Sequence, residues 1–348
     1  MKLKYFLIPL LLITLVIAGN AFSKQDSNTI VTPHLNIGVV KGKNVLYCST
    51  FQLAWNELKN KMVKEDIKLV NEPPMVGILN KGDFTTKDLS ENSYYATAGY
   101  GKDNIIQKIN VALRLKFWNN APTVKEKLRP LDIIAYAYLY KNLRFNPTFE
   151  PLKQPLKFNS LINVETFGID KFDYSKHKEI AKQVTVPYYN GDSDEFIVKL
   201  SPKNSNDEIF LAKIQPKATL NETLKLSQSK TSLTNVYLNE HDTLQIPKFD
   251  FKIEHSFKEL VDKFLSNKNF PDYKITEALQ NIDFKLNEKG AVLKSEAKIV
   301  ISKTSYMIKE EPKKLIFDKP FLIYLKEKQS SKPYLVIWVD NTDLLVKK

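Results

Sequence analysis

The stretch that decides the fold lies near the carboxyl end of the chain and begins with Leu286-Asn287-Glu288-Lys289-Gly290. It ends with two apolar runs, Phe317-Asp318-Lys319-Pro320-Phe321-Leu322-Ile323-Tyr324-Leu325 and Tyr334-Leu335-Val336-Ile337-Trp338-Val339. The first part closes a run of alternating apolar and polar residues, which is typical of a half-buried strand. The later runs are typical of a closing hairpin, and residues 291–316 have the pattern of an extended loop. The order is therefore strand, glycine hinge, loop and hairpin.

The composition is that of a folded protein with a sizeable core. Of 348 residues, 43% are hydrophobic and 11% are aromatic, and a chain of this length holds one large domain or two ordinary ones. We find no internal repeat and no linker, which favours one domain over residues 44–348. Residues 24–43 are polar and then irregular, and we interpret them as a lead-in segment.

The first 23 residues have the layout of a secretory signal. Lys2 and Lys4 give a basic start, Phe6–Ile17 is apolar, and Ala21-Phe22-Ser23 supplies small residues at a cleavage site. The apolar run is too short to favour a membrane span, and no cysteine lies nearby to carry a lipid. We predict a cleaved signal peptide over residues 1–23 and a secreted or periplasmic protein. An uncleaved anchor is the alternative.

The cysteine content and the net charge limit which binding partners are expected. Cys48 is the single cysteine, and we interpret it as a small buried side chain. The lysine-rich composition is typical of a bacterial envelope or secreted protein and gives a formal charge of +13, with a concentration at Lys59, Lys61, Lys64 and Lys68. Interspersed acidic residues favour a solvated helix face there, and binding to a polyanion or an anionic surface is the minority hypothesis. Nucleic acid is not an expected partner, since no binding module is recognisable.

Apolar periodicity predicts elements elsewhere in the chain. Val45–Met62 has the spacing of a helix, and Gln183–Leu200 has that of a hairpin around Asn190–Asp194. Ile133–Tyr140 is continuously apolar, as expected for a strand buried on both faces. Further predictions are a loop or short strand at Asn71–Asp88, a strand or short helix at Gly99–Trp118 and a helix at His255–Leu265.

No catalytic or metal-binding pattern stands out. The chain has no nucleophile-elbow serine, no phosphate-binding glycine loop and no paired cysteines. The histidines are scattered singly at His34, His177, His241 and His255. We therefore predict a protein that is not an enzyme and that uses no cofactor or metal.

Six segments of the chain are similar to segments of the serpin family and occur in the same order. They are Asn44–Cys48 (similar to the start of the second helix), Tyr136–Phe149 (a central-sheet strand and its exit), Val164–Phe167, Val186–Pro202 (a hairpin with a Pro-Tyr entry), Leu244–Phe249 (a strand with a Pro-Lys-Phe core) and the carboxyl-terminal stretch. The chain thus resembles a divergent, exported serpin, matched best over residues 131–345.

The resemblance implies an α+β fold with a single serpin-like domain. Its parts would be a large central mixed or antiparallel sheet, surrounding helices and an exposed reactive-centre loop over Ala291–Ile316. In inhibitory serpins a target protease cleaves this loop, the freed segment inserts into the sheet as a new strand, and the acyl-enzyme is trapped. The expected hinge and inserting residues are Glu288, Lys289, Gly290, Ala291, Leu293, Ser295 and Ala297. The expected bait-bond region is Lys303, Thr304, Ser305, Tyr306, Met307, Ile308 and Lys309.

The residues after the hinge fit insertion on one face. Alternation places on that face Ala291, Leu293, Ser295 and Ala297, and on the other Val292, Lys294, Glu296 and Lys298. An ordinary edge strand explains the same pattern, and Leu293 is bulky where fast insertion favours a small residue. Four departures from the family fall where its sheet opens: Phe51 for a small serine, Tyr136 for an asparagine, Arg144 near the place of a tryptophan and Gln280 for a histidine.

The sequence leaves two main functions open. The first is a secreted inhibitor of a serine or cysteine protease, with a trypsin-like target if cleavage follows Lys303 or Lys309 and a chymotrypsin-like target as the other possibility. The second is a serpin-fold protein that no longer inhibits and serves as a binding or structural module of the cell envelope. An unrelated exported α+β protein is a third hypothesis. We expect a monomer in each case.

Overall fold

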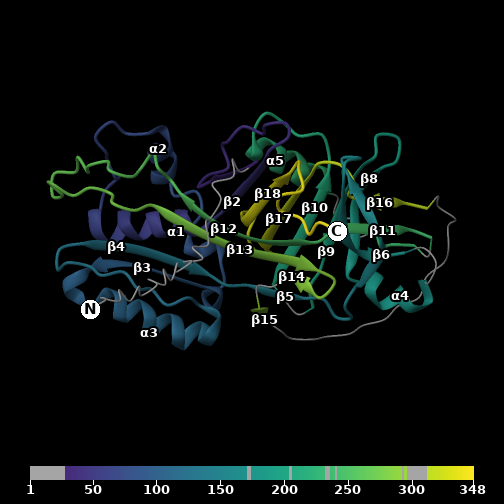
Figure 1. The fold of residues 1–348 in the computed structure, drawn as a ribbon, viewed down its shortest axis with the longest axis horizontal. Helices are drawn as coiled ribbons and strands as arrows, with labels where there is room; N and C mark the ends of the chain where they lie inside the picture. Colours follow the sequence, from purple (N-terminus) through teal and green to yellow (C-terminus); the bar gives the residue numbers. More distant parts are fainter. Residues whose placement is uncertain are drawn as a thin grey trace, which may run out of the picture.

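The protein is described by a computed structural model, shown in Figure 1, that covers residues 28–170, 174–203, 206–231, 236–239, 241–291, 294–295 and 312–348. The predicted signal peptide, residues 1–23, lies outside these ranges. Within them, no helix combines the length and the apolar character that crossing a membrane requires. Cys48 is buried, as predicted, and burial raises the pKa of its thiol.

A seven-stranded sheet forms one side of the core, in the order β1-β2-β18-β17-β10-β9-β8. Its strands are β1 (Thr29–Thr32), β2 (Asn44–Cys48), β8 (Val184–Asn190), β9 (Glu195–Leu200), β10 (Asp207–Lys213), β17 (Phe321–Glu327) and β18 (Pro333–Val339). The predicted closing hairpin is confirmed, since Phe321 lies opposite Val339 in antiparallel β17 and β18. Phe321–Leu325 of β17 and all of β18 are apolar, because one face packs on the main core and α5 (Leu220–Lys230) covers the other.

Three smaller sheets lie within the described residues (Figure 1). The four-stranded sheet, in the order β16-β11-β7-β6, consists of β6 (Glu150–Phe158), β7 (Ile162–Ile169), β11 (Thr243–Pro247) and β16 (Lys314–Ile316). The five-stranded sheet, in the order β12-β13-β14-β5-β15, consists of β5 (Asn142–Arg144), β12 (Phe249–Ser256), β13 (Leu279–Asn287), β14 (Gly290–Ala291) and β15 (Lys294–Ser295). The two-stranded sheet pairs β3 (Tyr94–Tyr100) with β4 (Ile133–Leu139).

The helices lie around these sheets. The first, α1 (Thr50–Glu57), continues as a π-helical turn over Leu58–Val63 and contacts both β4 and β13. α2 (Pro74–Asn80) packs on α1, and α4 (Tyr174–Ala181) lies beside β7. α3 (Ile105–Phe117) covers the face of the β3–β4 pair that points away from the main core. Figure 1 shows α3 running along these two strands.

One helix prediction is wrong at its start, and another is wrong throughout. Residues 45–48 of the predicted helix Val45–Met62 belong to strand β2, which pairs with β1 and β18 and is buried throughout, whereas residues 50–62 are helical as predicted. A fully buried strand and the helix that follows it merge into one apolar run, so spacing did not separate them. The predicted helix at His255–Leu265 is also wrong: Phe257 and Leu260 are buried, but the chain passes through turns, with a positive φ of 61° at Asp262.

The other differences have local causes. Asn71–Asp88 contains helix α2 rather than a loop or strand, because Pro74 stands at the first helical positions, where a missing N–H costs nothing. For Gly99–Trp118 the sequence left a strand or a short helix open, and the structure shows a helix there, α3. The lead-in over residues 24–43 is not wholly irregular, since β1 extends the main sheet. Ile133–Tyr140 contains the predicted strand, but its residues are only half-buried because the β3–β4 pair has just two strands.

Candidate functional site

The candidate site begins at the end of β13, where the alternating pattern of the sequence becomes a strand with one buried face. Phe284 and Leu286 are 3% and 0% exposed, whereas Asp283 and Lys285, which alternate with them, are exposed. Asn287 Oδ1 accepts a hydrogen bond from Lys289 N at 2.9 Å, which closes a tight turn. Gly290 and Ala291 then pair back onto Asn287 and Leu286 as β14. The predicted glycine hinge is thus a hairpin whose short second strand is buried.

The hinge docks onto β5 through backbone contacts. Gly290 lies opposite Arg144 and Ala291 lies opposite Leu143, so β14 is held between β13 and β5. A Cβ atom on Gly290 would lie 2.1 Å from the Leu143 carbonyl oxygen, and its φ of +134° disfavours any other residue. The carbonyl oxygen of Lys289 accepts a further bond from the amide of Phe145 (3.0 Å). Glycine is therefore required here by close approach as well as by conformation.

An ion pair fixes the turn from the side. The Glu288 carboxylate lies 3.0 Å from Lys248 Nζ, and both side chains are less than a fifth exposed. Burial alone would raise the pKa of Glu288, but a backbone hydrogen bond and the Lys248 ammonium outweigh it, so the pKa lies below its ordinary value. The Glu288 carbonyl oxygen also accepts a bond from Phe149 N (2.9 Å). The turn is held in one position by charge and by the backbone.

Beyond the hinge, the sheet is parted. β4 pairs with β3 along one edge, and β13 pairs with β12 along one edge. Within the described ranges, the other edge of β4 and the other edge of Leu279–Lys285 have no strand partner. We call these two the open edges. Because β5 continues the line of β4, β14 occupies the start of the strand position that lies between the open edges.

Comparisons with known proteins bear on this arrangement. No family model matches the sequence, and a search of curated proteins finds no match. Among solved structures, a serpin from the trematode Schistosoma haematobium is similar over 86% of this chain and 94% of its own, with 14% identity and a TM-score of 0.51. The chain has a serpin-like fold. At this identity the likeness concerns the fold alone.

Two further solved structures are similar at lower scores. Tengpin, a thermophilic serpin in its native state, is 11% identical, with 87% of this chain and 90% of that chain covered and a TM-score of 0.49. Thyroxine-binding globulin in complex with thyroxine is 12% identical, with 86% and 92% covered and a TM-score of 0.48.

In this serpin-like fold, α1 lies beneath the parted sheet and its contacts anchor β13. Gln280, which is 4% exposed, donates hydrogen bonds from Nε2 to the Cys48 carbonyl oxygen (2.9 Å) and to Thr50 Oγ1 (2.8 Å). The Phe51 ring packs on Phe257 with their centroids 4.3 Å apart. Two of the four departures from the family thus tie β13 and its neighbours to α1. Separating β13 from α1 would break the hydrogen bond between Gln280 and Thr50.

The other two departures point away from the open edges. Tyr136 packs with α3 on the outer face of β4, where burial raises the pKa of its phenol to about 12. Arg144 is exposed at the end of β5. By contrast, Ala137 and Leu139 pack toward the main core, on the face that an inserted strand would share. Tyr136 therefore leaves the inward face of this strand position free of its ring.

The structure brings together the first four predicted hinge residues and leaves most of the others outside its description. Glu288, Lys289, Gly290 and Ala291 form the docked turn. Ser295 is described only as backbone in β15, which runs parallel to β5. Leu293, Ala297 and the bait-bond region from Lys303 to Lys309 lie outside the described residues. Their roles stay predictions.

Sequence reasoning missed the partners of the hinge. Lys248 and the short strand β5 are separated from Glu288 and Gly290 by tens of residues or more, and no local pattern relates them. Among the described residues, no group of three or more His, Cys, Asp and Glu side chains could hold a metal ion.

Proposed function

We propose that this protein is an exported inhibitor of serine or cysteine proteases that acts by inserting its cleaved loop between the open edges. The observation that carries the proposal is the docked hinge at the start of a strand position that no described residue fills. Two edges that have no strand partner among the described residues lie on either side of the line that β14 begins. Unpaired edges are templates for strand addition.

The register of the hinge supports the proposal. Leu286 lies opposite Ala291, and continuing that antiparallel register would set Leu293 opposite Phe284, Ser295 opposite Ile282 and Ala297 opposite Gln280. Those partners are 3%, 6% and 4% exposed. Directly opposite residues share a face of a sheet, so the apolar and small residues of the loop would point into the core. Lys294 would lie on the solvent face opposite Asp283, whose charge is opposite.

The chemistry required of the chain itself is modest. The protease nucleophile attacks the carbonyl carbon of one peptide bond, the bait bond, within the region from Lys303 to Lys309. The C–N bond of that peptide breaks, and the leaving amine takes up the proton that the nucleophile has lost. The carbonyl carbon is then esterified to the protease serine, or thioesterified to its cysteine. The freed segment must insert before water hydrolyses this ester, and every 1.4 kcal/mol added to the insertion barrier slows insertion about tenfold.

Incubation with trypsin and with chymotrypsin tests the proposal. We expect an adduct that survives boiling in detergent and a large rise in the melting temperature of the cleaved protein. Lys303→Ala and Lys309→Ala, tested singly, locate the bond if trypsin forms the adduct. A clean cut without adduct and with an unchanged melting temperature would sink the proposal.

A non-inhibitory binding or structural protein of the envelope is the second candidate. It is favoured by the Phe51–Phe257 contact beneath the sheet and by bulky Leu293, because both raise the barrier to opening and filling the sheet. This candidate predicts cleavage without an adduct. Leu293→Ala distinguishes slow insertion from none, because it should restore adduct formation only if insertion competes with hydrolysis.

A further inference from the structure

Helix α3 carries apolar side chains on two opposite faces. Its inward face packs against β3 and β4 and consists of Ile105, Ile109, Leu113 and Phe117, each at most 5% exposed. On the outward side, Val111 and Leu115 lie about one turn apart and are 51% and 76% exposed, and Trp118, which directly follows the helix, is 77% exposed. A helix that is apolar on both sides is normally covered on both sides. The outward face, defined by these three residues, is therefore a candidate docking surface.

Trp118 stands in a backbone conformation that costs free energy. Its φ is 52° and its ψ is −129°, a combination that residues with a Cβ rarely adopt. The strain is not repaid by burial of the indole, which points to solvent. Strained residues persist at functional sites more often than elsewhere. This conformation leaves a large aromatic ring exposed at the carboxyl end of α3.

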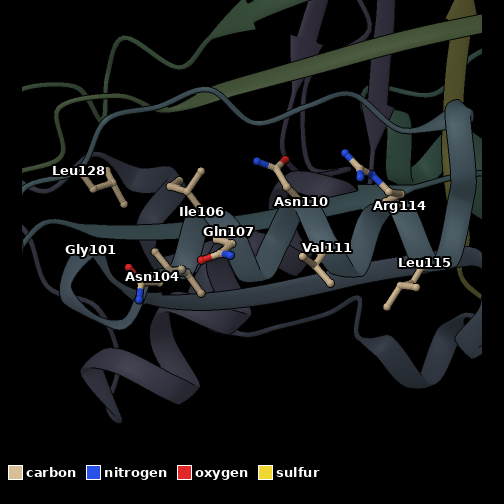
Figure 2. Close-up of a pocket in the computed structure, with 10 residues that line it drawn as sticks. Gly101, Asn104, Ile106, Gln107, Asn110, Val111, Arg114, Leu115 and Leu128 are labelled. Atoms are coloured by element: carbon tan, nitrogen blue, oxygen red, sulfur yellow. The ribbon is translucent and has the colours of Figure 1, made fainter.

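The charged side chains of α3 itself are all positive. α3 contains Lys108, Arg114 and Lys116 and no acidic residue, and Lys108 and Arg114 are exposed. An open groove of ≈ 700 Å³ follows the helix, lined by Val111, Arg114 and Leu115 among others (Figure 2). In Figure 2 the side chains of Val111 and Leu115 project to the same side of the helix. Exposed apolar and cationic groups are thus interleaved along one element.

We propose that the outward face of α3 binds a lipid membrane surface that contains anionic headgroups. Tryptophan and leucine insert at the boundary of headgroups and acyl chains, and lysine and arginine pair with lipid phosphates. Three side chains are few beside the roughly 20–30 residues, with roughly 800 Å² of buried surface, that each partner of a stable protein complex contributes. A membrane needs no such area, because a few inserted side chains and a cationic rim suffice. This inference is independent of protease inhibition.

Intrinsic fluorescence tests the contact directly, because the chain has three tryptophans and the other two are buried: Trp55 is 4% and Trp338 1% exposed. With vesicles of equal parts phosphatidylglycerol and phosphatidylcholine, we expect the emission to shift to shorter wavelength and to be quenched by brominated acyl chains. Trp118→Phe should abolish both changes, and pure phosphatidylcholine should produce neither. If the protein sediments with the anionic vesicles while Trp118 emission is unchanged, another segment binds and the proposal is overturned.

Co-sedimentation of matched variants provides the second test. Leu115→Asp should weaken binding to the anionic vesicles at least tenfold. Leu161→Asp, at an equally exposed leucine in the β6–β7 turn, should not change it. Lys108→Gln with Arg114→Gln should weaken binding and reduce its dependence on salt. Trp118→Gly should raise the melting temperature, because glycine tolerates this backbone, and should still weaken binding.

Other occupants of the face give distinct outcomes. If analytical ultracentrifugation finds a dimer that Leu115→Asp dissociates, a second copy covers the face, and the proposal is wrong. Equal binding of the wild type and Leu115→Asp to the anionic vesicles contradicts it as well.

Discussion

At the scale of single residues, geometry and charge set the position of the hinge. Gly290 lies where any side chain would strike the backbone of β5. Glu288 lies where a carboxylate meets the ammonium of Lys248 in a largely buried pair. The first contact is steric and insensitive to pH, whereas the second is electrostatic and depends on protonation. The two can therefore be tested separately.

Gly290→Ala should destabilise the protein by roughly 1–3 kcal/mol, because the new Cβ clashes with Leu143 and the positive φ is strained. Denaturation by urea measures the effect. Gly77→Ala is the control: Gly77 lies inside α2 with open space around it, and alanine there should stabilise by about 0.5–1 kcal/mol. Equal effects of the two changes would contradict the docked hinge.

Glu288→Gln should lower the free energy of unfolding by about 1–2 kcal/mol at neutral pH. This lies between the contribution of an exposed ion pair and that of a charge-assisted hydrogen bond. The pKa of Glu288 is lowered in the folded state, so its stabilisation is complete above the ordinary value of 4.5 and is lost as pH falls through the folded pKa. The difference in unfolding free energy between wild type and variant should therefore be constant from pH 7 to about 5.

Below that range the difference should shrink with falling pH. Glu165→Gln is the matched control, because Glu165 pairs with the same lysine at 3.3 Å but its side chain is 46% exposed. We expect a loss below about 0.5 kcal/mol for it. A Glu288→Gln difference that grows on acidification would show that the ion pair does not stabilise the turn.

At the scale of elements, the two faces of one strand position carry the proposed mechanism. The buried face of β13 presents Ile282 and Phe284, and the core side of β4 presents Ala137 and Leu139. A segment that fills the position must bring apolar side chains to this face and can bring charges only to the other. Whether a substituted side chain lies on the buried face or on the solvent face should therefore decide whether the segment inserts.

Ser295→Arg should convert an inhibitor into a substrate, because the proposed insertion would move position 295 from its pairing with β5 to a place opposite buried Ile282, where an unpaired guanidinium is costly. Glu296→Arg carries the same new side chain one residue further, on the solvent face, and should leave inhibition within about threefold, an effect below 1 kcal/mol. The measurement is the number of inhibitor molecules consumed per protease trapped. Equal losses in the two variants would contradict the register.

At the scale of the whole molecule, a buried ion triad joins the parted sheet to the seven-stranded sheet. Lys141, between β4 and β5, lies 2.7 Å from Asp207 of β10 and contacts Glu327 of β17. Ser90 also donates to Glu327 (2.6 Å). All three triad side chains are at most 10% exposed. The triad fixes the strand beside the hinge to the seven-stranded sheet.

Lys141→Met should cost about 3–5 kcal/mol, because two buried carboxylates lose their counter-charge. Adding Asp207→Asn and Glu327→Gln should recover much of the loss, as urea denaturation would measure. Lys199→Met, which breaks a more exposed pair with Glu208 at 3.4 Å, should cost below about 1 kcal/mol. A loss of that size for Lys141→Met would mean that the triad contributes no specific support.

The local sequence pattern was sufficient to predict strands that stand apart from their neighbours as an alternating or an apolar run. The alternation of Ile282, Phe284 and Leu286 predicted β13, and two apolar runs predicted the β17–β18 hairpin. Pattern was insufficient at Val45–Cys48, where a buried strand runs almost directly into a helix, and at His255–Leu265, where turns have helical spacing. Continuous burial removes the periodicity that separates strand from helix.

The sequence by itself determined the serpin-like fold, the glycine at the hinge and the alternation that insertion requires, because these follow from the period of a strand and from the order of segments. Only the tertiary structure decided what the hinge touches. Lys248, β5 and the open edges come from parts of the chain with no local relation to Gly290. Their convergence depends on the packing of several sheets around one core, which local sequence does not encode.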